Sequence, residues 1–219
     1  MPRWATFDCY GTLIDWDGGI RSTLARLWPR EDAERLLAAY HAAEPLIEQH
    51  HPSVSYRDVL AASLREVSAR RGLQLAPEDE CALGDSLPEW APFPEVPGAL
   101  AELRRRGWRL VPLSNTDPDL IAASIERIGA EFDDVITARE AGSYKPAHGH
   151  WQVFFERTGA TPAEHVHVAA SLFHDIAPAG ELGLASVWIN RLGEERGPIP
   201  TRELPDLTGL PDTLDSLVP

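Results

Sequence analysis

From residue 97 to residue 190, segments with helical spacing of apolar residues alternate with short apolar segments. Strands that alternate with helices of about 10 to 15 residues indicate a parallel, doubly wound sheet. We therefore predict an α/β fold. The predicted helices cover 97–106, 118–129, 147–158 and 176–182, and the predicted strands cover 109–113, 135–137, 165–169 and 186–190.

A further strand is predicted at 4–7, and it delivers a carboxylate, Asp8, to its C-terminal end. The chain then turns at Gly11, and Thr12 supplies a hydroxyl. Ligands of open α/β sheets collect at the carboxyl ends of the strands, and a carboxylate there can attack an electrophile to form a covalent intermediate. An Asp after a strand also serves as a turn former or a helix cap, so the role of Asp8 depends on the rest of the chain.

The region between the first strand and the alternating region predicts helices that do not belong to the sheet. Helical spacing of apolar residues covers 31–50 and 55–71, and a shorter helix with Pro in its first turn covers 77–87. Three prolines between residues 92 and 97 break the pattern and indicate a return linker. We predict a core domain (1–14 and 93–219) and a helical cap domain (15–92), with a short helix closing the C-terminal tail.

The composition is that of an ordinary globular protein, with 43% hydrophobic and 25% charged residues in a chain of 219. A formal net charge of −14 argues against a nucleic-acid or anionic-membrane partner. A small anionic substrate stays compatible, because a nearby lysine and backbone dipoles outweigh distant surface charge. The two cysteines, Cys9 and Cys81, form no disulfide framework and point to a reducing compartment. No apolar run reaches the roughly 18 to 20 residues of a membrane span, and no signal-type segment begins the chain, so we expect a cytoplasmic protein.

Four short motifs follow the predicted strands in order. They are Asp8-Cys9-Tyr10-Gly11-Thr12, Leu113-Ser114-Asn115, Tyr144-Lys145-Pro146, and the segment 169–175 with Ser171 and Asp175. In these motifs and in their order, the chain resembles the haloacid dehalogenase superfamily over nearly its whole length. The resemblance implies a Rossmann-like core with an inserted helical cap.

The resemblance also implies a role for each motif. Asp8 would be the nucleophile, positioned by Thr12 and Lys145. A cation within about 4 to 6 Å lowers the pKa of a carboxylate, so Lys145 would keep Asp8 ionised. Asp175 would orient or deprotonate the hydrolytic water. The structural alternatives are a solvated surface lysine for Lys145 and a helix cap for Asp175.

The second and fourth motifs imply contacts with substrate. Ser114 and Asn115 would hold the substrate carboxylate and the halide side of the pocket, and Ser171 would lie beside the substrate as well. A serine at the end of a strand is otherwise a helix cap, although here Asp117 could cap the next helix instead.

Tyr10 separates two reaction types. Phosphatases of this superfamily carry a second aspartate two residues after the nucleophile, which protonates the leaving alcohol. Halide needs no proton, so Tyr10 is compatible with carbon–halogen cleavage, and Asp-x-Tyr-Gly-Thr resembles the type II L-2-haloacid dehalogenase branch. The segments 91–97 and 188–191 (Trp-Ile-Asn-Arg) also resemble that branch. The branch implies hydrolysis of short 2-haloacids such as haloacetates through an ester on Asp8, with no cofactor.

His41 departs from the branch, which has an arginine at the aligned position on its first cap helix. A histidine is smaller and only partly charged at neutral pH. It favours a tighter pocket for a small halide such as fluoride, or a different substrate. The alternative is a histidine on the surface of the cap.

Further departures lie in and near the fourth motif. Ala170 and Leu172 replace a serine and an asparagine, so contacts that position water are missing and His174 would supply a substitute. Trp151 replaces a tyrosine and would offer its N–H to an anion, or pack. Cys9 would pack, with a place in the substrate pocket as the alternative. His165 and His167 alternate along a predicted strand and are interpreted as structural.

Two competing functions remain open. A magnesium-dependent phosphatase of the same fold would use Asp8 and Asp175 as metal ligands, although phosphatases carry a pair of acids where this chain has only Asp175. A non-catalytic binding or scaffold protein would explain Ala170 and Leu172, whereas the intact Asp8 and Lys145 argue against it. The resemblance also implies a homodimer through the cap and apolar helix faces.

Overall fold

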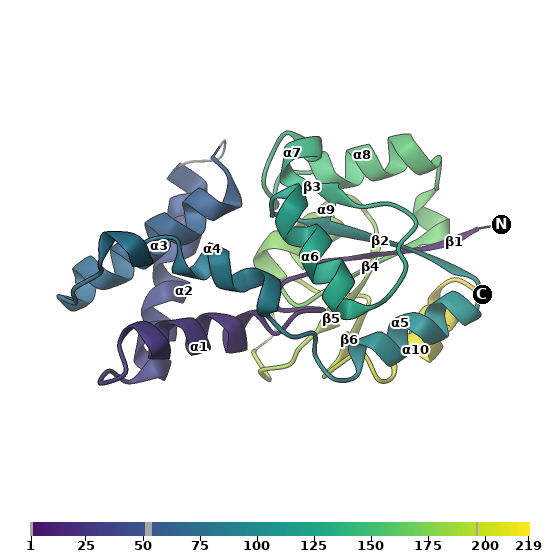
Figure 1. Ribbon diagram of the computed structural model, residues 1–219. Coiled ribbons are helices and arrows are strands. Elements are labelled where there is room, and N and C mark those ends of the chain that lie inside the picture. Colours follow the sequence, from purple (N-terminus) through teal and green to yellow (C-terminus); the bar gives the residue numbers. More distant parts are fainter. Residues whose placement is uncertain (1, 51–53, 196) are drawn as a thin grey trace.

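The computed structural model describes residues 2–50, 54–195 and 197–219. Within them, the chain forms one parallel sheet in the strand order β3-β2-β1-β4-β5-β6, flanked by helices (Figure 1). The doubly wound α/β fold is thereby confirmed. The strands are β1 (Arg3–Phe7), β2 (Trp108–Ser114), β3 (Ile136–Thr137), β4 (His165–Ala169), β5 (Ala185–Ile189) and β6 (Arg202–Leu204).

The two faces of the sheet bury different side chains of β1. Trp4 packs with Val111, Trp151 and Phe154 on one face, whereas Ala5 and its neighbours pack on the other. Because both faces are covered, the strands read as nearly continuous apolar runs instead of alternating with polar residues. The covering helices are α5 (Val96–Arg105), α6 (Pro118–Ile128), α7 (Ala138–Ala141), α8 (Gly149–Thr158), α9 (Ala177–Glu181) and α10 (Leu210–Leu217).

Strand β1 lies at the centre of the sheet, between β2 and β4. The chain continues from β1 to β2 and β3 on one side, and then crosses from β3 to β4 on the other side of β1. The C-terminal end of β1 is therefore a topological switch point, where α/β sheets bind ligands. The ladder continues one residue past the strand, where the Asp8 N–H donates to the Val168 carbonyl at 3.0 Å. Asp8 is thus fixed at this end of the sheet by its own backbone.

The segment between β1 and α5 forms a separate group of helices beside the sheet (Figure 1). The residue boundaries of the two predicted domains stay predictions, whereas the inserted helices are observed. The helix predicted at 77–87 is divided into three shorter pieces. The group comprises α1 (Trp16–Leu27), α2 (Ala33–His50), α3 (Tyr56–Arg71), η1 (Pro77–Asp79), α4 (Ala82–Ser86) and η2 (Leu87–Glu89).

Helix α1 was not predicted, because Gly18 and Gly19 weaken the helical pattern. The structure shows why Gly19 is there. A Cβ at this position would lie 2.3 Å from Cδ2 of Trp90, so the helix approaches the indole more closely than any side chain would permit. Asp15 caps the helix by accepting the Gly18 N–H at 2.9 Å.

The start of the last crossover differs from the predicted helix at 176–182. A π-helical turn, η4 (Leu172–Ile176), precedes α9, and the Ile176 N–H donates to the Ser171 carbonyl at 3.1 Å. Such turns are rare and occur frequently at functional sites. The widened turn carries His174 and Asp175 in succession. Strand β6 was also not predicted, because it has three residues and none is fully buried.

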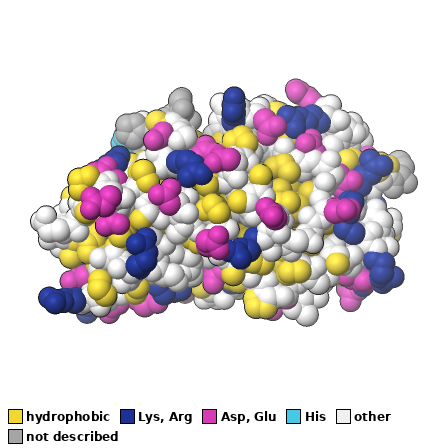
Figure 2. All heavy atoms as spheres, in the orientation of Figure 1, with side chains coloured by type: hydrophobic (Ala, Val, Ile, Leu, Met, Phe, Trp, Pro, Cys, Tyr) yellow, Lys and Arg dark blue, Asp and Glu magenta, His cyan; other side chains and the backbone are white. Residues whose placement is uncertain are grey.

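The surface carries charges of both signs. On the face drawn in Figure 2, Lys and Arg side chains lie interspersed with Asp and Glu side chains over both the inserted helices and the sheet region. Across the described residues, we find no helix whose length and apolar character would let it span a lipid bilayer.

Candidate active site

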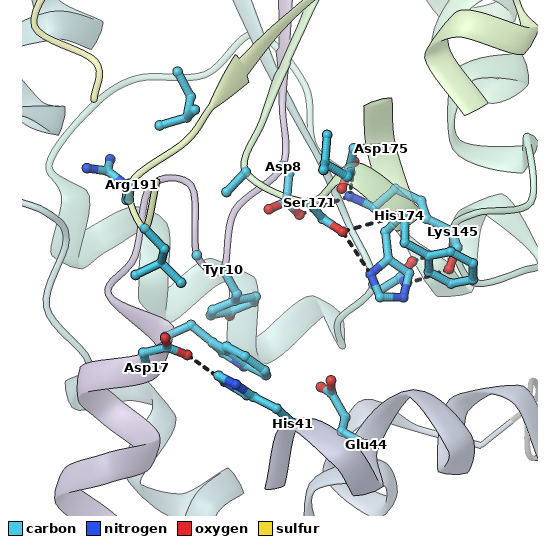
Figure 3. A pocket seen from close by; sticks show the side chains of 18 of the residues that line it. Asp8, Tyr10, Asp17, His41, Glu44, Lys145, Ser171, His174, Asp175 and Arg191 are labelled. Carbon is cyan, nitrogen blue, oxygen red and sulfur yellow. Dashed lines mark hydrogen bonds and ion pairs between the residues drawn. The ribbon is translucent and has the colours of Figure 1, made fainter. Parts of the chain in front are cut away.

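A cavity of about 610 Å³ lies between the C-terminal ends of the strands and the inserted helices. Its core wall includes Asp8, Lys145 and Asp175, and its cap wall includes Glu44 (Figure 3). Glu48 also belongs to the cap wall. The residues predicted from three separate motifs therefore meet in one place. This volume lies within the range of about 300–1,000 Å³ that is typical of ligand pockets.

Two groups hold the Asp8 carboxylate. Thr12 donates its hydroxyl to Oδ2 at 2.7 Å, and Lys145 Nζ donates to Oδ1 at 2.9 Å. Gly11 has φ 87°, a left-handed conformation that brings Thr12 back toward the carboxylate. Thr12 Oγ1 also accepts the N–H of Ala170 at 2.9 Å, which links the first motif to the fourth.

Lys145 is the central cation of the core wall, and its side chain is 1% exposed. Its ammonium group donates to Asp8 Oδ1, to Asp175 Oδ1 at 2.6 Å and to the Leu113 carbonyl at 2.9 Å. These contacts use all three of its protons. Burial lowers the pKa of Lys145, but Asp175 and Asp8 outweigh burial and hold that pKa above its usual value. Lys145 is therefore a permanent charge rather than a proton donor.

Asp175 is held by a second group that the sequence analysis interpreted as structural. His167 Nε2 donates to Asp175 Oδ1 at 3.0 Å, and its Nδ1 lies 2.8 Å from the Thr6 hydroxyl. Burial raises the pKa of Asp175, but Lys145 and His167 outweigh burial and hold the pKa well below its usual range. Asp175 Oδ2 has no partner among the described residues. The role of His167 depends on its place opposite Thr6 in the β1–β4 register. The sequence alone does not reveal this register.

The residues of the second motif have different roles. Ser114 lines the cavity, and its hydroxyl is buried without a partner in the described part of the chain. Asn115 also lines the cavity, but its amide closes two bonds with the backbone of Lys145, at 3.0 and 2.7 Å. Asn115 thus holds the backbone of Lys145 in place. Of the two residues, Ser114 is the one whose polar group is available to a ligand.

Tyr10 lines the cavity with its ring, while its hydroxyl is bonded to Ser124 at 2.9 Å. Burial raises the pKa of Tyr10, so this phenol stays neutral. Cys9 packs as expected, and its alternative place in the substrate pocket is wrong. Trp151 also packs, so its expected contact with an anion is wrong. Both are buried, at 1% and 0% exposure, and pack outside the lining of the cavity. The Trp151 ring packs edge-on against His167 instead.

His41 lies at the rim of the cavity, on α2. Its ring stacks on Trp16 at 5.2 Å between centroids, and its Nε2 lies 2.8 Å from Asp17 Oδ1 (Figure 3). The imidazole of His41 is therefore already paired with a carboxylate. At the position that aligns with the branch arginine, this chain has a histidine that is bound to Asp17 instead of a cation directed at the substrate.

Arg191 was part of a quoted motif but was not predicted as a site residue. Its guanidinium donates to the Thr12 carbonyl at 2.8 Å, pairs with Glu95 at 2.7 Å and lies over the Phe93 ring. It lines the cavity and ties the loop that follows β1 to the return linker.

Glu44 and Glu48 were not predicted, because glutamates on a helix usually belong to its solvated face. Here they are 6% and 8% exposed. Tyr56 donates its hydroxyl to Glu44 Oε1 at 3.0 Å, and His174 Nε2 lies 3.4 Å from Glu48 Oε2. Burial, together with the charge of Glu48, raises the pKa of Glu44 to about 8. The raised pKa therefore favours the protonated form of Glu44 at neutral pH, and Glu48 is paired with His174.

The donor set fits a magnesium ion poorly. Lys145 Nζ lies between Asp8 and Asp175 and uses one oxygen of each, while Thr12 uses the second oxygen of Asp8. Within the described ranges, no group of three or more His, Cys, Asp or Glu side chains is arranged to hold a metal ion.

Comparison with known proteins decides the family. The model of the haloacid dehalogenase-like hydrolases matches residues 2–183. The chain belongs to this family. This result confirms the resemblance carried by the four motifs. Because the members of the family are hydrolases, the protein is a hydrolase.

Similar haloacid dehalogenase-like proteins cover nearly the whole chain. The (S)-2-haloacid dehalogenase of Pseudomonas sp. (strain YL) is 28% identical over 96% of this chain and 93% of its own length. Haloacetate dehalogenase H-2 of Moraxella sp. (strain B) is 28% identical over 91% of this chain and 92% of its own. A crystal structure of an L-2-haloacid dehalogenase superimposes with a TM-score of 0.88 at 25% identity, covering 98% of this chain and 99% of the other.

Proposed function

We propose that this protein hydrolyses the carbon–halogen bond of short 2-haloacids, through an ester formed on Asp8. The observation that carries the proposal is the environment of Asp8, a carboxylate held by Thr12 and Lys145 at the floor of a cavity. The ammonium group favours the ionised carboxylate that an attack on carbon requires. The names of the similar proteins, which act on 2-haloacids or haloacetate, support the substrate class.

In the first step, the Asp8 carboxylate attacks the halogen-bearing carbon from the side opposite the halogen. An ester bond forms, the carbon–halogen bond breaks, and halide leaves without needing a proton. Tyr10 supports this reaction type, because its hydroxyl is engaged with Ser124 and its pKa is raised by burial. In the second step, water attacks the ester carbonyl carbon and releases a 2-hydroxyacid with inverted configuration.

The cavity supports a small anionic substrate despite its acidic residues. Glu44 is protonated at neutral pH, because burial and Glu48 raise its pKa to about 8. Glu48 itself faces His174. The hydroxyl of Ser114, which has no partner among the residues described, is available to donate to the substrate carboxylate. Release of fluoride, as well as of larger halides, is part of the proposal because His41 takes the position of the larger arginine.

We further propose that the reaction needs no metal. The commitment of Asp8 and Asp175 to Lys145 supports this proposal, since the magnesium-dependent phosphatase alternative would use these same carboxylates as ligands.

The test measures fluoride, chloride and phosphate release from haloacetates, (S)-2-chloropropionate and a generic phosphate ester, with and without EDTA. We expect halide release that EDTA leaves unchanged, and none from Asp8→Asn. Phosphate release that requires added magnesium, without halide release, would replace this proposal by the phosphatase.

A further inference from the structure

A chain of three polar side chains runs from the core wall to the cap wall of the cavity. Ser171 Oγ accepts the backbone N–H of His174 at 3.0 Å and lies 3.2 Å from His174 Nδ1. On the other side of the imidazole, Nε2 lies 3.4 Å from Glu48 Oε2. Figure 3 shows Ser171 and His174 on the same side of the cavity as Asp8, above the helix that carries Glu44.

The π-helical turn creates this arrangement. Ser171 caps η4, and the turn places His174 toward the cap while its neighbour Asp175 contacts Lys145. All of Ser171, His174, Asp175 and Glu48 line the cavity. His174 therefore contacts the cap wall, and the next residue, Asp175, contacts Lys145 on the core wall.

Hydrogen-bond capacity determines how protons can be arranged in this chain. A neutral imidazole has one N–H and one free lone pair. The N–H on Nε2 faces the Glu48 carboxylate, so the lone pair on Nδ1 accepts the hydroxyl proton of Ser171. A hydroxyl oxygen has two acceptor sites, and the His174 N–H uses one of them. The second is left for a water molecule in the cavity.

Asp175 is poorly suited to accept a proton in the second step. Its Oδ1 already accepts from both Lys145 and His167, and its pKa is held well below its usual range. An efficient general base has a pKa near the operating pH. Asp175 can orient a water through its free Oδ2, but it binds a proton too weakly to act as the base.

We propose that Ser171 and His174, with Glu48 of the cap as the group that orients the imidazole, take up the proton of the hydrolytic water. This inference rests on the proposed function, because it concerns hydrolysis of the ester on Asp8. Ser171 and His174 are its catalytic residues, and Glu48 is a positioning residue.

The step balances in protons and electrons. The water oxygen bonds to the ester carbonyl carbon, one water proton moves to Ser171, and the Ser171 proton moves to His174 Nδ1. The tetrahedral intermediate then breaks its bond to the substrate oxygen, and that oxygen takes the proton back through Ser171 to become the hydroxyl of the product. Asp8 keeps the water oxygen and loses the second water proton to solvent as its carboxylate re-forms beside Lys145.

Titratable groups of both walls act on His174. Glu48 and Glu44 face it from α2, and Asp175 and Lys145 face it from the core. Burial lowers the pKa of His174, but Glu48 outweighs burial and leaves the pKa above its usual value. Because the neutral form is the base, ester hydrolysis should become faster as the pH rises through this pKa.

The first test is rapid-quench kinetics of His174→Gln with (S)-2-chloropropionate. We expect a chloride burst of about one equivalent per enzyme, followed by turnover reduced about 10²- to 10⁴-fold. The intact mass of the quenched protein should show the ester. The matched control is His148→Gln, which removes a histidine paired with Glu181 at 3.0 Å outside the cavity and should keep normal turnover.

The second test uses Glu48→Gln, which keeps the shape of the side chain. Without the carboxylate the pKa of His174 falls, so the rising limb of the pH profile of turnover should move to lower pH while the burst rate stays unchanged. Burst and turnover that fall together in His174→Gln, or a pH profile that Glu48→Gln leaves in place, would overturn the relay. Absence of any halide from the unsubstituted protein would instead contradict the proposed function.

Discussion

The core wall and the cap wall of the cavity compensate buried charge in different ways. On the core wall, Lys145 lies between Asp8 and Asp175 and pairs with both at 2.9 and 2.6 Å. On the cap wall, Glu44 accepts a hydrogen bond from Tyr56 and Glu48 pairs with His174, and the pKa of Glu44 rises to about 8. The core wall thus balances its carboxylates with a buried cation, whereas on the cap wall the raised pKa of Glu44 favours its protonated form.

This contrast explains how one cavity can hold many acids and still accept an anion. An ion pair fixes the ionised state at all pH values near neutral, whereas protonation makes the state depend on pH. Substitutions on either wall and on exposed pairs test this difference.

Asp8→Asn should reduce halide release by at least about 10⁴-fold, because removing a nucleophile removes the whole covalent route. The measurement is halide release by ion chromatography. Asp119→Asn, at an exposed carboxylate paired with Arg57, is the control and should keep full activity. Substantial turnover by Asp8→Asn would show that the core wall does not supply the nucleophile.

Lys145→Met should lower the free energy of unfolding by about 3–5 kcal/mol, because it leaves two buried carboxylates without their cation. Arg21→Met removes the cation of the exposed Arg21–Glu34 pair on the cap and should cost less than about 1 kcal/mol. Urea unfolding of both variants measures the difference. Equal losses would mean that the core wall gains nothing from its buried ion pairs.

Glu44→Gln should change how stability depends on pH. The folded-state pKa of Glu44, about 8, lies above the unfolded value near 4.5. The folded protein therefore binds this proton more tightly, and its stability should fall as the pH rises from about 4.5 to about 8. Urea unfolding across this range should show a shallower decline in Glu44→Gln than in the unsubstituted protein. Parallel curves would mean that Glu44 is already ionised at low pH in the folded state.

His41→Ala should change the free energy of unfolding by less than about 1 kcal/mol, because the His41–Asp17 pair is partly exposed, at 39% and 25%. Thermal or urea unfolding of the variant measures this. If the free energy of unfolding fell by several kcal/mol, the His41–Asp17 pair would contribute to stability as the buried ion pairs of the core wall do.

Much of the fold could be predicted because periodicity reports burial on each element. The alternation after residue 97 predicted the parallel sheet, and the C-terminal pattern predicted α10 (Leu210–Leu217). Helix α1 was missed because Gly19 is selected by its contact with Trp90 rather than by helix propensity. The π-helical turn was missed because its widened hydrogen bonding has no apolar period of its own.

The candidate site divides in the same way. Asp8, Lys145 and Asp175 could be predicted because each follows a strand whose end lies at the same edge of the sheet. His167, Glu44 and Glu48 could not, since their roles depend on partners from distant segments. Cys9 and Trp151 were assigned from their neighbours in sequence, but side chains that flank a site residue on a strand or helix can point into the core. The cytoplasmic location and the homodimer stay predictions.

A single-turnover reaction in heavy-oxygen water, with enzyme in excess over (S)-2-chloropropionate, shows whether Asp8 forms an ester with the substrate. Mass spectrometry then locates the label in the Asp8 peptide and in the 2-hydroxyacid. Heavy oxygen in Asp8 and an unlabelled product are expected, because the product takes its oxygen from the carboxylate. Label in the product hydroxyl and none in Asp8 would contradict an ester on this residue.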